Sequence, residues 1–255
     1  MDAPDSRRSV KTAAKTFEIL ETIRDNDGMR LSELASELDV AKSTLHRYLQ
    51  TLVDLEYLVT NGHRYHIGLR FLDLGEHARN RVQGSHLISR KVSDLAVETD
   101  ERAQFIVEEH GSAVYLYRET GSNAVQTDPG IGKRIDLHST AAGKAIMAEW
   151  PDDAVERFCE RGGLPARTEQ TITDPEVLMD EVRKIREQGY SVNTQENIDG
   201  LRAMGVPVSG QEGDVIGAFS VSGPLNRMKG EWFETELPDL LRGIANEIEL
   251  NLRYS

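Results

Sequence analysis

The amino-acid sequence predicts an α+β protein with two domains. A chain of 255 residues with 38% hydrophobic content can bury one large or two medium-sized cores, and this length favours two domains. Helical segments and a hairpin are predicted in the first 70 residues. The β-rich segments that follow have helices at both ends, which is typical of an α+β domain rather than of regularly alternating strands and helices.

Three amphipathic helices and one β-hairpin are predicted in the N-terminal part. The first helix, at 10–23, has an apolar face that includes Phe17, and the second, over LSELASEL, has Ser32 as its expected N-cap. A third helix follows from Lys42 to about residue 55. The stretch YLVTNGHRYHIG then predicts two short strands around an Asn-Gly turn. This element order is typical of a winged helix-turn-helix.

The C-terminal part is predicted to begin after a polar connecting helix. We expect a winged helix-turn-helix domain at 1–70, a linker helix at 71–84 and a second domain at 85–255. The strands expected in the second domain are AQFIVEEH, SAVYLYRE, NAVQT, LRAMGVPVSG and VIGAFSVSGP, the last two paired around the turn QEGD. The helices expected there are GSHLISRKVSDLAVETDE, TAAGKAIMAEW, 152–161, 175–188 and 231–253.

The charge is distributed unevenly between the two parts. A net charge of −13 argues against a nucleic-acid-binding protein, because phosphate recognition uses Lys and Arg. Residues 1–70, however, hold 10 Lys and Arg against 11 Asp and Glu, whereas residues 71–255 hold 20 against 32. The N-terminal part is therefore nearly neutral, and a DNA-facing surface is compatible with it.

The basic residues comprise only 8 Lys among 30, in a chain with a large acidic excess. This composition resembles that of halophilic proteins from salt-saturated cytoplasms, such as those of haloarchaea. Counterion release contributes little free energy to DNA binding in concentrated salt. We therefore expect base-edge and groove contacts to supply more of any affinity for DNA.

The predicted location of the protein is the cytoplasm. No stretch approaches the roughly 18 consecutive apolar residues of a membrane span, and the N-terminal MDAPDSRRSVKT has no apolar signal segment. The single cysteine, Cys159, can form no internal disulfide and cannot supply a structural zinc cluster. We expect no membrane partner, no bound metal and no cofactor.

The helix expected from Lys42 onward has polar residues on one side and leucines on the other. Ser43 and Thr44 are short donors for phosphates or base edges, and the guanidinium of Arg47 matches the O6 and N7 acceptors of guanine. At the hairpin tip, His63 and Arg64 are placed to meet the adjacent groove or backbone. The residues predicted to contact a double-stranded DNA operator are Lys42, Ser43, Thr44, His46, Arg47, Gln50, His63 and Arg64.

An ordinary solvated face is the alternative for such a helix taken alone. The complete order of helices, turn and wing favours DNA binding, because all of these elements have to coincide. A ligand-sensing adaptor that acts through protein contacts, without reading DNA directly, is the second hypothesis.

Small and hydroxylated residues predict a ligand pocket in the second domain. The segment LHSTAAGK leads from a strand end into a helix, where backbone amides can hold an anion. Ser220 and Ser222 are two apart in a predicted strand, so both hydroxyls face one side and need partners. A small carboxylate or a sugar acid would supply them. The alternative is that the serines bond to neighbouring backbone while the alanines permit close packing.

Four blocks of the sequence resemble the isocitrate-lyase-regulator-like (IclR) transcription factors, and together they span nearly the whole chain. They are SVKTAAKTFEILETI, LSELASELDVAKSTLHRYLQTLVDLEYL, LHSTAAGKAIMA and GYSVNTQENIDGLRAMGVPVSGQEGDVIGAFSVSGP. The resemblance implies a winged helix-turn-helix, a C-terminal GAF-like effector-binding domain, and a homodimer or homotetramer. It implies a sequence-specific transcriptional regulator controlled by a small metabolite, a sugar, sugar acid or small carboxylate, and acting on a catabolic operon.

The resemblance also implies where the effector pocket lies. Carried over by position, the family's pocket falls on Ala124, Thr127, Ala141, Ala142, Asn193, Leu201, Ala203, Ser220 and Ser222. The sequence departs from the family at Asn193 and Ala203, where related regulators often have a carboxylate and a cysteine, and at Thr127, where a larger apolar residue occurs. A neutral Asn193 would repel an anion less than Asp does and could donate a hydrogen bond, which favours a sugar or sugar acid.

The sequence is not expected to encode an enzyme. His63 and His66 lie at a hairpin tip without a cysteine or a third metal ligand, and Cys159 is expected on the buried side of a helix. His138 and Ser139 are neighbours in a predicted strand end and would point to opposite faces. None of these groups makes a nucleophile and base pair or a metal cluster.

Overall fold

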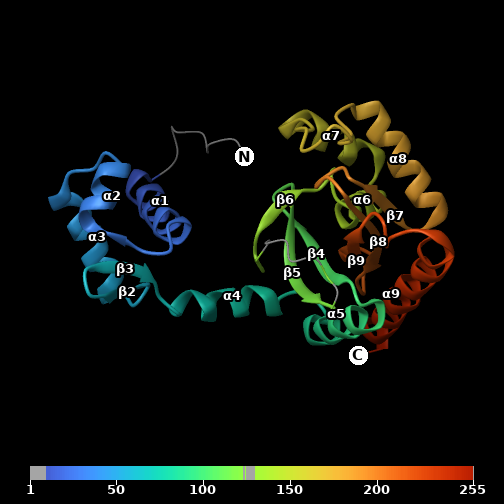
Figure 1. Ribbon diagram of the computed structural model, residues 1–255, viewed down its shortest axis with the longest axis horizontal. Helices are drawn as coiled ribbons and strands as arrows, with labels where there is room; N and C mark the ends of the chain where they lie inside the picture. Colours follow the sequence, from blue (N-terminus) through green and yellow to red (C-terminus); the bar gives the residue numbers. More distant parts are fainter. Residues whose placement is uncertain (1–9, 123, 125–129, 255) are drawn as a thin grey trace. The chain divides into compact units, whose positions relative to one another are not determined.

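The chain folds into two units, Met1–Arg79 and Asn80–Ser255, in a computed structural model that describes residues 10–122, 124 and 130–254. Each unit has its own antiparallel sheet and its own hydrophobic core. The division falls at the end of helix α4 (Arg70–Asn80), which occupies most of the segment predicted as a linker (Figure 1). The limits 1–70, 71–84 and 85–255 stay a prediction.

The first unit packs helices against a small sheet. Helices α1 (Lys11–Asp25), α2 (Leu31–Glu37) and α3 (Lys42–Asp54) enclose a core of leucine and isoleucine side chains. Strands β1 (Met29–Arg30), β2 (Leu58–Asn61) and β3 (Arg64–Ile67) lie in the order β1-β3-β2 with antiparallel pairing. The prediction of a winged helix-turn-helix is confirmed.

Two local details of this unit correct the sequence prediction. Ser32 is not the N-cap of α2, because Arg30 occupies the cap position and its backbone N–H donates to Oε2 of Glu33 at 2.8 Å. In the hairpin, Asn61 is the last residue of β2, so the two turn residues are Gly62 and its successor. Gly62 has φ +59°, a left-handed conformation that a glycine adopts without strain.

The apolar face of α1 also differs from the prediction. Phe17 is 61% exposed, whereas Ile19, Leu20 and Ile23 are buried. The helix therefore turns a different side to the core than the spacing of Phe17 indicated. The exposed face of α1 has no covering element among the described residues of this unit.

The second unit is a six-stranded antiparallel sheet with helices on both faces (Figure 1). The sheet order is β6-β5-β4-β9-β8-β7, and the strands are β4 (Arg102–Glu109), β5 (Ser112–Thr120), β6 (Arg134–Asp136), β7 (Ser191–Thr194), β8 (Leu201–Ser209) and β9 (Val215–Pro224). One face is covered by α5 (Ser85–Thr99) and α9 (Leu237–Tyr254), which the short π-helix Trp232–Glu236 precedes. The other face carries α6 (Ala141–Ala148), α7 (Asp152–Gly162) and α8 (Pro175–Gln188). The predicted α+β class is confirmed.

The sheet contains strands that the sequence did not predict. β6 and β7 are its two edges and are only 3 and 4 residues long, too short for a clear alternating pattern. The strand predicted at NAVQT lies outside the described residues except for Ala124. The predicted pair of strands around QEGD is confirmed as β8 and β9, with Ala203 opposite Ser222 and Gly205 opposite Ser220.

Gly205 allows the N-terminal end of α6 to lie directly on β8. A Cβ atom at position 205 would be 2.8 Å from the carbonyl carbon of Ala141 and from the nitrogen of Ala142. Ser191 of β7 reinforces this contact, because its Oγ lies 2.5 Å from the carbonyl oxygen of Ala141 and 3.2 Å from that of Gly205. The start of α6 is thereby fixed over β7 and β8.

Replacing Gly205 with alanine is expected to lower the free energy of unfolding by roughly 1–3 kcal/mol, because the added methyl group has to displace the backbone of α6. Urea denaturation at constant salt measures this change. Gly243→Ala is the matched control, since Gly243 is exposed in α9 and an added Cβ would meet nothing within 4 Å. The control exchange is expected to stabilise by about 0.5–1 kcal/mol. Equal effects of the two exchanges would contradict the tight contact at Gly205.

Candidate functional site

Helix α3 presents a polar face outside the core of the first unit. Leu45 and Leu49 are 0% exposed and Leu52 is 5% exposed, so these three side chains fix the orientation of the helix. Ala41 at the N-cap makes no side-chain cap hydrogen bond, which leaves the first backbone amides of α3 accessible to a phosphate. The predicted DNA-contacting residues on this helix are all exposed: Lys42, Ser43, Thr44, His46, Arg47 and Gln50.

Two of the residues predicted to contact DNA have partners within the unit. The Nη1 of Arg64 donates to the carbonyl oxygen of Gly28 at 2.6 Å, and its Nη2 lies 3.5 Å from a carboxylate oxygen of Glu33. Arg64 therefore ties the hairpin to the turn before β1. Gln50 donates from Nε2 to Oδ1 of Asp54 at 2.7 Å. His63, in contrast, is exposed in the hairpin turn.

The second unit contains a cavity of about 290 Å³ between the sheet and the start of α6. It brings together seven of the residues predicted from the sequence: Ala141, Ala142, Asn193, Leu201, Ala203, Ser220 and Ser222. Ala124 is half-buried but does not line this cavity, and Thr127 lies outside the described residues. That these seven residues bind an effector stays a prediction.

The floor of the cavity includes polar side chains that the sequence reasoning missed. Arg102 lies opposite Ser222 in the pairing of β4 with β9, and Gln104 lies opposite Ser220. Arg102 donates from Nε to Oγ of Ser222 at 3.0 Å, while Nε2 of Gln104 is 3.2 Å from Oγ of Ser220 and 3.3 Å from that of Ser222. The available signal was the alternation of two polar residues in the otherwise apolar strand RAQFIV.

Burial shifts the proton equilibria of two side chains at this floor. Arg102 is 5% exposed, and its removal from water lowers the pKa of its guanidinium, although Tyr115 and Glu101 act in the opposite direction. Burial likewise raises the pKa of the Tyr115 phenol, which the charge of Arg102 partly offsets. Both shifts reflect the burial of these two side chains among protein atoms.

The N-terminus of α6 forms another part of the cavity wall. Thr140 caps the helix by accepting a hydrogen bond from the backbone N–H of Gly143 at 3.1 Å. The backbone N–H groups of Ala141 and Ala142 have no hydrogen-bond acceptor within the described residues. Both residues line the cavity, and their amides belong to the positive end of the helix dipole.

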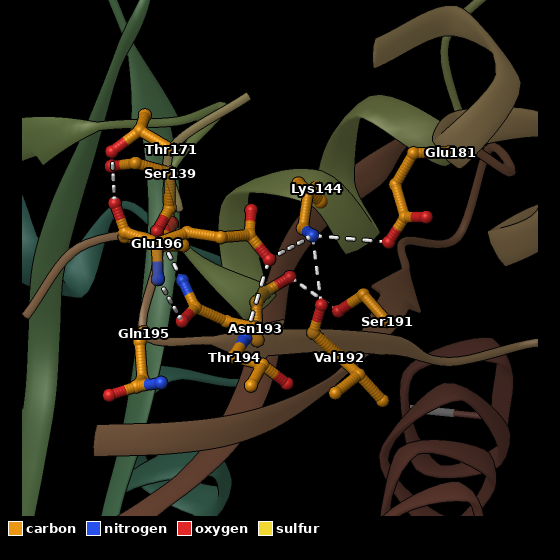
Figure 2. Close-up of polar contacts among 12 residues, drawn as sticks. Ser139, Lys144, Thr171, Glu181, Ser191, Val192, Asn193, Thr194, Gln195 and Glu196 are labelled. Carbon is orange, nitrogen blue, oxygen red and sulfur yellow. Dashed lines mark hydrogen bonds and ion pairs between the residues drawn. The ribbon is translucent and has the colours of Figure 1, made fainter. Parts of the chain in front are cut away.

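A fully buried lysine links this wall to the rest of the unit. Figure 2 shows the ammonium group of Lys144 between carboxylates of two different segments, with Oε1 of Glu196 at 2.8 Å and Oε1 of Glu181 at 3.1 Å. It also donates to the carbonyl oxygen of Val192 at 2.8 Å. Burial raises the pKa of Glu196, and the nearby ammonium of Lys144 lowers it in part. The network joins α6, α8 and the loop that follows β7.

Asn193 of β7 has a structural role, because it holds the loop that follows this strand. Its Nδ2 donates to the carbonyl oxygen of Ser139, and its Oδ1 accepts the backbone N–H of Glu196 at 3.2 Å (Figure 2). Thr171 adds a hydrogen bond from Oγ1 to the carbonyl oxygen of Glu196 at 2.6 Å. Each end of the amide thus has one backbone partner, and that Asn193 also contacts an effector stays a prediction.

Other candidate reactive groups are engaged or inert. His138 and Ser139 lie in the turn before α6 and not in a strand, and Nε2 of His138 lies 3.1 Å from the carbonyl oxygen of Pro165. Cys159 is buried, and burial raises the pKa of its thiol. The described residues contain no group of three or more His, Cys, Asp or Glu able to hold a metal. No described helix is long and apolar enough to cross a membrane.

Two family models match the chain in the order of its two units. The IclR helix-turn-helix domain matches residues 12–62, and the model described as bacterial transcriptional regulator IclR C-terminal matches residues 80–250. The second match alone covers more than half of the 255 residues. Both halves of the fold are thus similar to one kind of regulator.

Known proteins of this kind are similar to the chain over nearly its whole length. A probable HTH-type transcriptional regulator, ArcR of Halobacterium salinarum, is 32% identical over 249 residues, covering 96% of this chain and 95% of the relative. The crystal structure of Thermotoga maritima IclR has a TM-score of 0.83 at 29% identity, over 96% of this chain and 99% of that chain. An IclR homologue from Microbacterium hydrocarbonoxydans, complexed with 4-hydroxybenzoate, has the same fold, with a TM-score of 0.78 at 24% identity over 95% of this chain and 99% of that chain.

These matches, together with the winged unit and the sheet domain, define a DNA-binding transcriptional regulator. Its C-terminal domain is of the effector-binding class. The chain belongs to the IclR family. The resemblance read from the sequence is therefore confirmed. Members of this family are transcription regulators and not enzymes, which confirms that prediction as well.

Lys144→Met is expected to lower the free energy of unfolding by roughly 3–5 kcal/mol near pH 7.5, because it leaves buried Glu196 without its cation. The loss is expected to shrink as the pH falls towards about 5.5. Burial raises the pKa of Glu196 in the folded protein, so the folded variant binds a proton more readily than the unfolded chain and gains stability at lower pH. Urea denaturation at several pH values measures the difference from the unsubstituted protein.

Arg186→Met is the matched control for this experiment. Arg186 of α8 bonds to the carbonyl oxygens of Ala148 and Trp150 near the opposite end of α6. It also pairs with Asp152 of α7 at 2.6 Å, and no contact with Glu196 is present among the described residues. Its loss removes one cation and leaves Asp152, which is about half exposed, without its partner, so its effect on stability should change less with pH than that of Lys144→Met. A pH-independent loss for Lys144→Met would argue against an uncompensated Glu196.

Proposed function

We propose that the protein binds an operator sequence through α3 and that a small carboxylate anion in the cavity of the second unit controls this binding. The observation that carries the proposal is a set of hydrogen-bond donors at the cavity for which the described residues supply no acceptor. They are the backbone N–H groups of Ala141 and Ala142 and the hydroxyls of Ser220 and Ser222. Because the serine oxygens accept hydrogen bonds from Arg102 and Gln104, the serine protons are available to an acceptor.

A carboxylate matches these donors in charge and in number of acceptor sites. The start of α6 provides a positive dipole end, and each carboxylate oxygen accepts two hydrogen bonds. No Asp or Glu side chain is present among the described residues that line the cavity, although the chain as a whole is strongly acidic. An anion near Arg102 would also offset the desolvation that lowers the pKa of this guanidinium.

The size of the cavity supports a small metabolite. Its volume of about 290 Å³ is at the lower end of the range for ligand pockets, roughly 300–1,000 Å³. Sugar acids and short carboxylic acids fit this volume and carry the required charge, whereas a neutral sugar lacks that charge. Control by such a metabolite is consistent with regulation of a catabolic operon.

The exposed face of α3 supports direct reading of an operator. Arg47 and Thr44 are assigned to base edges, while Lys42 and Ser43 at the start of the helix are assigned to phosphates. A symmetric operator would be met by a homodimer or homotetramer, which presents two recognition helices. Family membership favours this function over an adaptor that acts only through protein contacts.

Arg47→Ala is expected to weaken binding to the operator by about 1–3 kcal/mol and to relax the preference for the contacted base pair. Gel shifts with the upstream regions of neighbouring genes, across a salt series, measure both effects. Lys42→Ala is the comparison variant. It should weaken binding to all DNA sequences alike and reduce the slope of log K against log salt concentration by about one. Sequence-specific binding that survives Arg47→Ala unchanged would remove the assignment of this residue.

Ser220→Ala is expected to reduce the thermal stabilisation produced by a bound carboxylate, because one donor to the anion is lost. Thermal unfolding with pyruvate and with D-gluconate, each at millimolar concentration, measures the shift in Tm. Ser209→Ala is the control, since Ser209 is at the far end of β8 and outside the cavity lining. A ligand-induced shift that is the same in Ser220→Ala and in Ser209→Ala would count against the proposed site.

A further inference from the structure

Gln104 has an unmet hydrogen-bonding requirement at the floor of the cavity. This side chain is 4% exposed, and its Nε2 bonds to Ser220 and Ser222. Its Oε1 is buried and has no hydrogen-bond partner within the part of the chain that the structure describes. Turning the amide by 180° exchanges the two ends but still leaves one of them without a partner. Buried polar atoms in this state are uncommon in native proteins, and each one calls for an explanation.

Oε1 has almost no accessible surface, so a ligand reaches it only when the Gln104 side chain turns towards the cavity that it lines. A ligand hydroxyl would then satisfy this amide in either orientation. A hydroxyl group both donates and accepts hydrogen bonds, so it pairs with Oε1 or with Nε2 of Gln104. A carboxylate oxygen accepts only, and a methylene group does neither. The residue therefore favours a ligand that has a hydroxyl in addition to its acid group.

The arrangement of the floor indicates more than one such group along an extended ligand. Arg102 and Gln104 are two apart on β4, and their partners Ser222 and Ser220 are two apart on β9. Residues two apart on a strand are separated by about 6.4–6.8 Å, so the polar row is as long as several bonds of a carbon chain. An aromatic ring lying on this row would offer no hydrogen-bond partner to Oε1 of Gln104.

We propose that Gln104 is a specificity-determining residue that selects acyclic hydroxy acids of the sugar-acid type over unsubstituted and aromatic acids. The inference rests on the proposed carboxylate effector and names its class. The carboxylate meets the amides of Ala141 and Ala142 and the serine hydroxyls, while a hydroxyl on the carbon chain bonds to the free end of the Gln104 amide.

The test compares acids that differ in their hydroxyl groups. Isothermal titration calorimetry of the full-length protein uses D-gluconate and D-galactonate, hexanoate of the same chain length, and 4-hydroxybenzoate. The unsubstituted protein is expected to bind at least one hexonate about tenfold or more tightly than hexanoate. Gln104→Leu is expected to bring this ratio close to one. Arg186→Met, which lies outside the cavity lining, is expected to keep it.

The outcomes separate this inference from the proposal on which it rests. Three results would overturn the role of Gln104 and leave a carboxylate effector intact. Hexanoate could bind as tightly as both hexonates, or 4-hydroxybenzoate could bind more tightly than the hexonates. The third result is a ratio of hexonate to hexanoate affinity that Gln104→Leu leaves unchanged. Absence of binding by all four acids would overturn the proposed function and this inference with it. If Gln104→Leu fails to fold, Gln104→Asn provides a shorter amide, and a full ratio in that variant would equally contradict the proposal.

Discussion

The candidate effector site depends on the close packing of the start of α6 against β8. Only at a glycine such as Gly205 can the helix backbone approach the sheet this closely, and Ser191 adds hydrogen bonds that hold the helix end in place. The same contact holds Ala141 and Ala142 at the wall of the cavity. A side chain at position 205 would push the helix outward, so the position of these two residues follows from the absence of one Cβ atom.

The buried network around Lys144 extends this constraint away from the helix start. An unpaired ammonium in the interior would be strongly unfavourable, and Glu196, Glu181 and the carbonyl oxygen of Val192 compensate it. These partners come from α8, β7 and the loop after β7, so one charge fixes several segments around the cavity. The pairing is specific in geometry, because each acceptor has to meet the same nitrogen atom.

Many of the residues at the candidate site could be predicted from the sequence, because the patterns that indicate them are local. Alternation along a strand placed Ser220 and Ser222 on one side, and helical spacing separated the leucines of α3 from its polar face. Arg102 and Gln104 were missed because their relation to the serines depends on the pairing of β4 with β9, which joins residues more than 100 positions apart. Short-range patterns contain no information about such a register.

The sequence by itself determined the family, the winged fold and the main strands and helices, since each of these rests on periodicity or on a contiguous motif. Tertiary structure decided how individual polar groups are used. Arg64 and Asn193 are predicted to contact DNA and ligand, and the folded chain also gives each of them a backbone acceptor, which the sequence did not indicate. The reason is physical, because a buried or half-buried polar group bonds to whatever partner the packing brings within about 3 Å, and packing is a property of the whole fold.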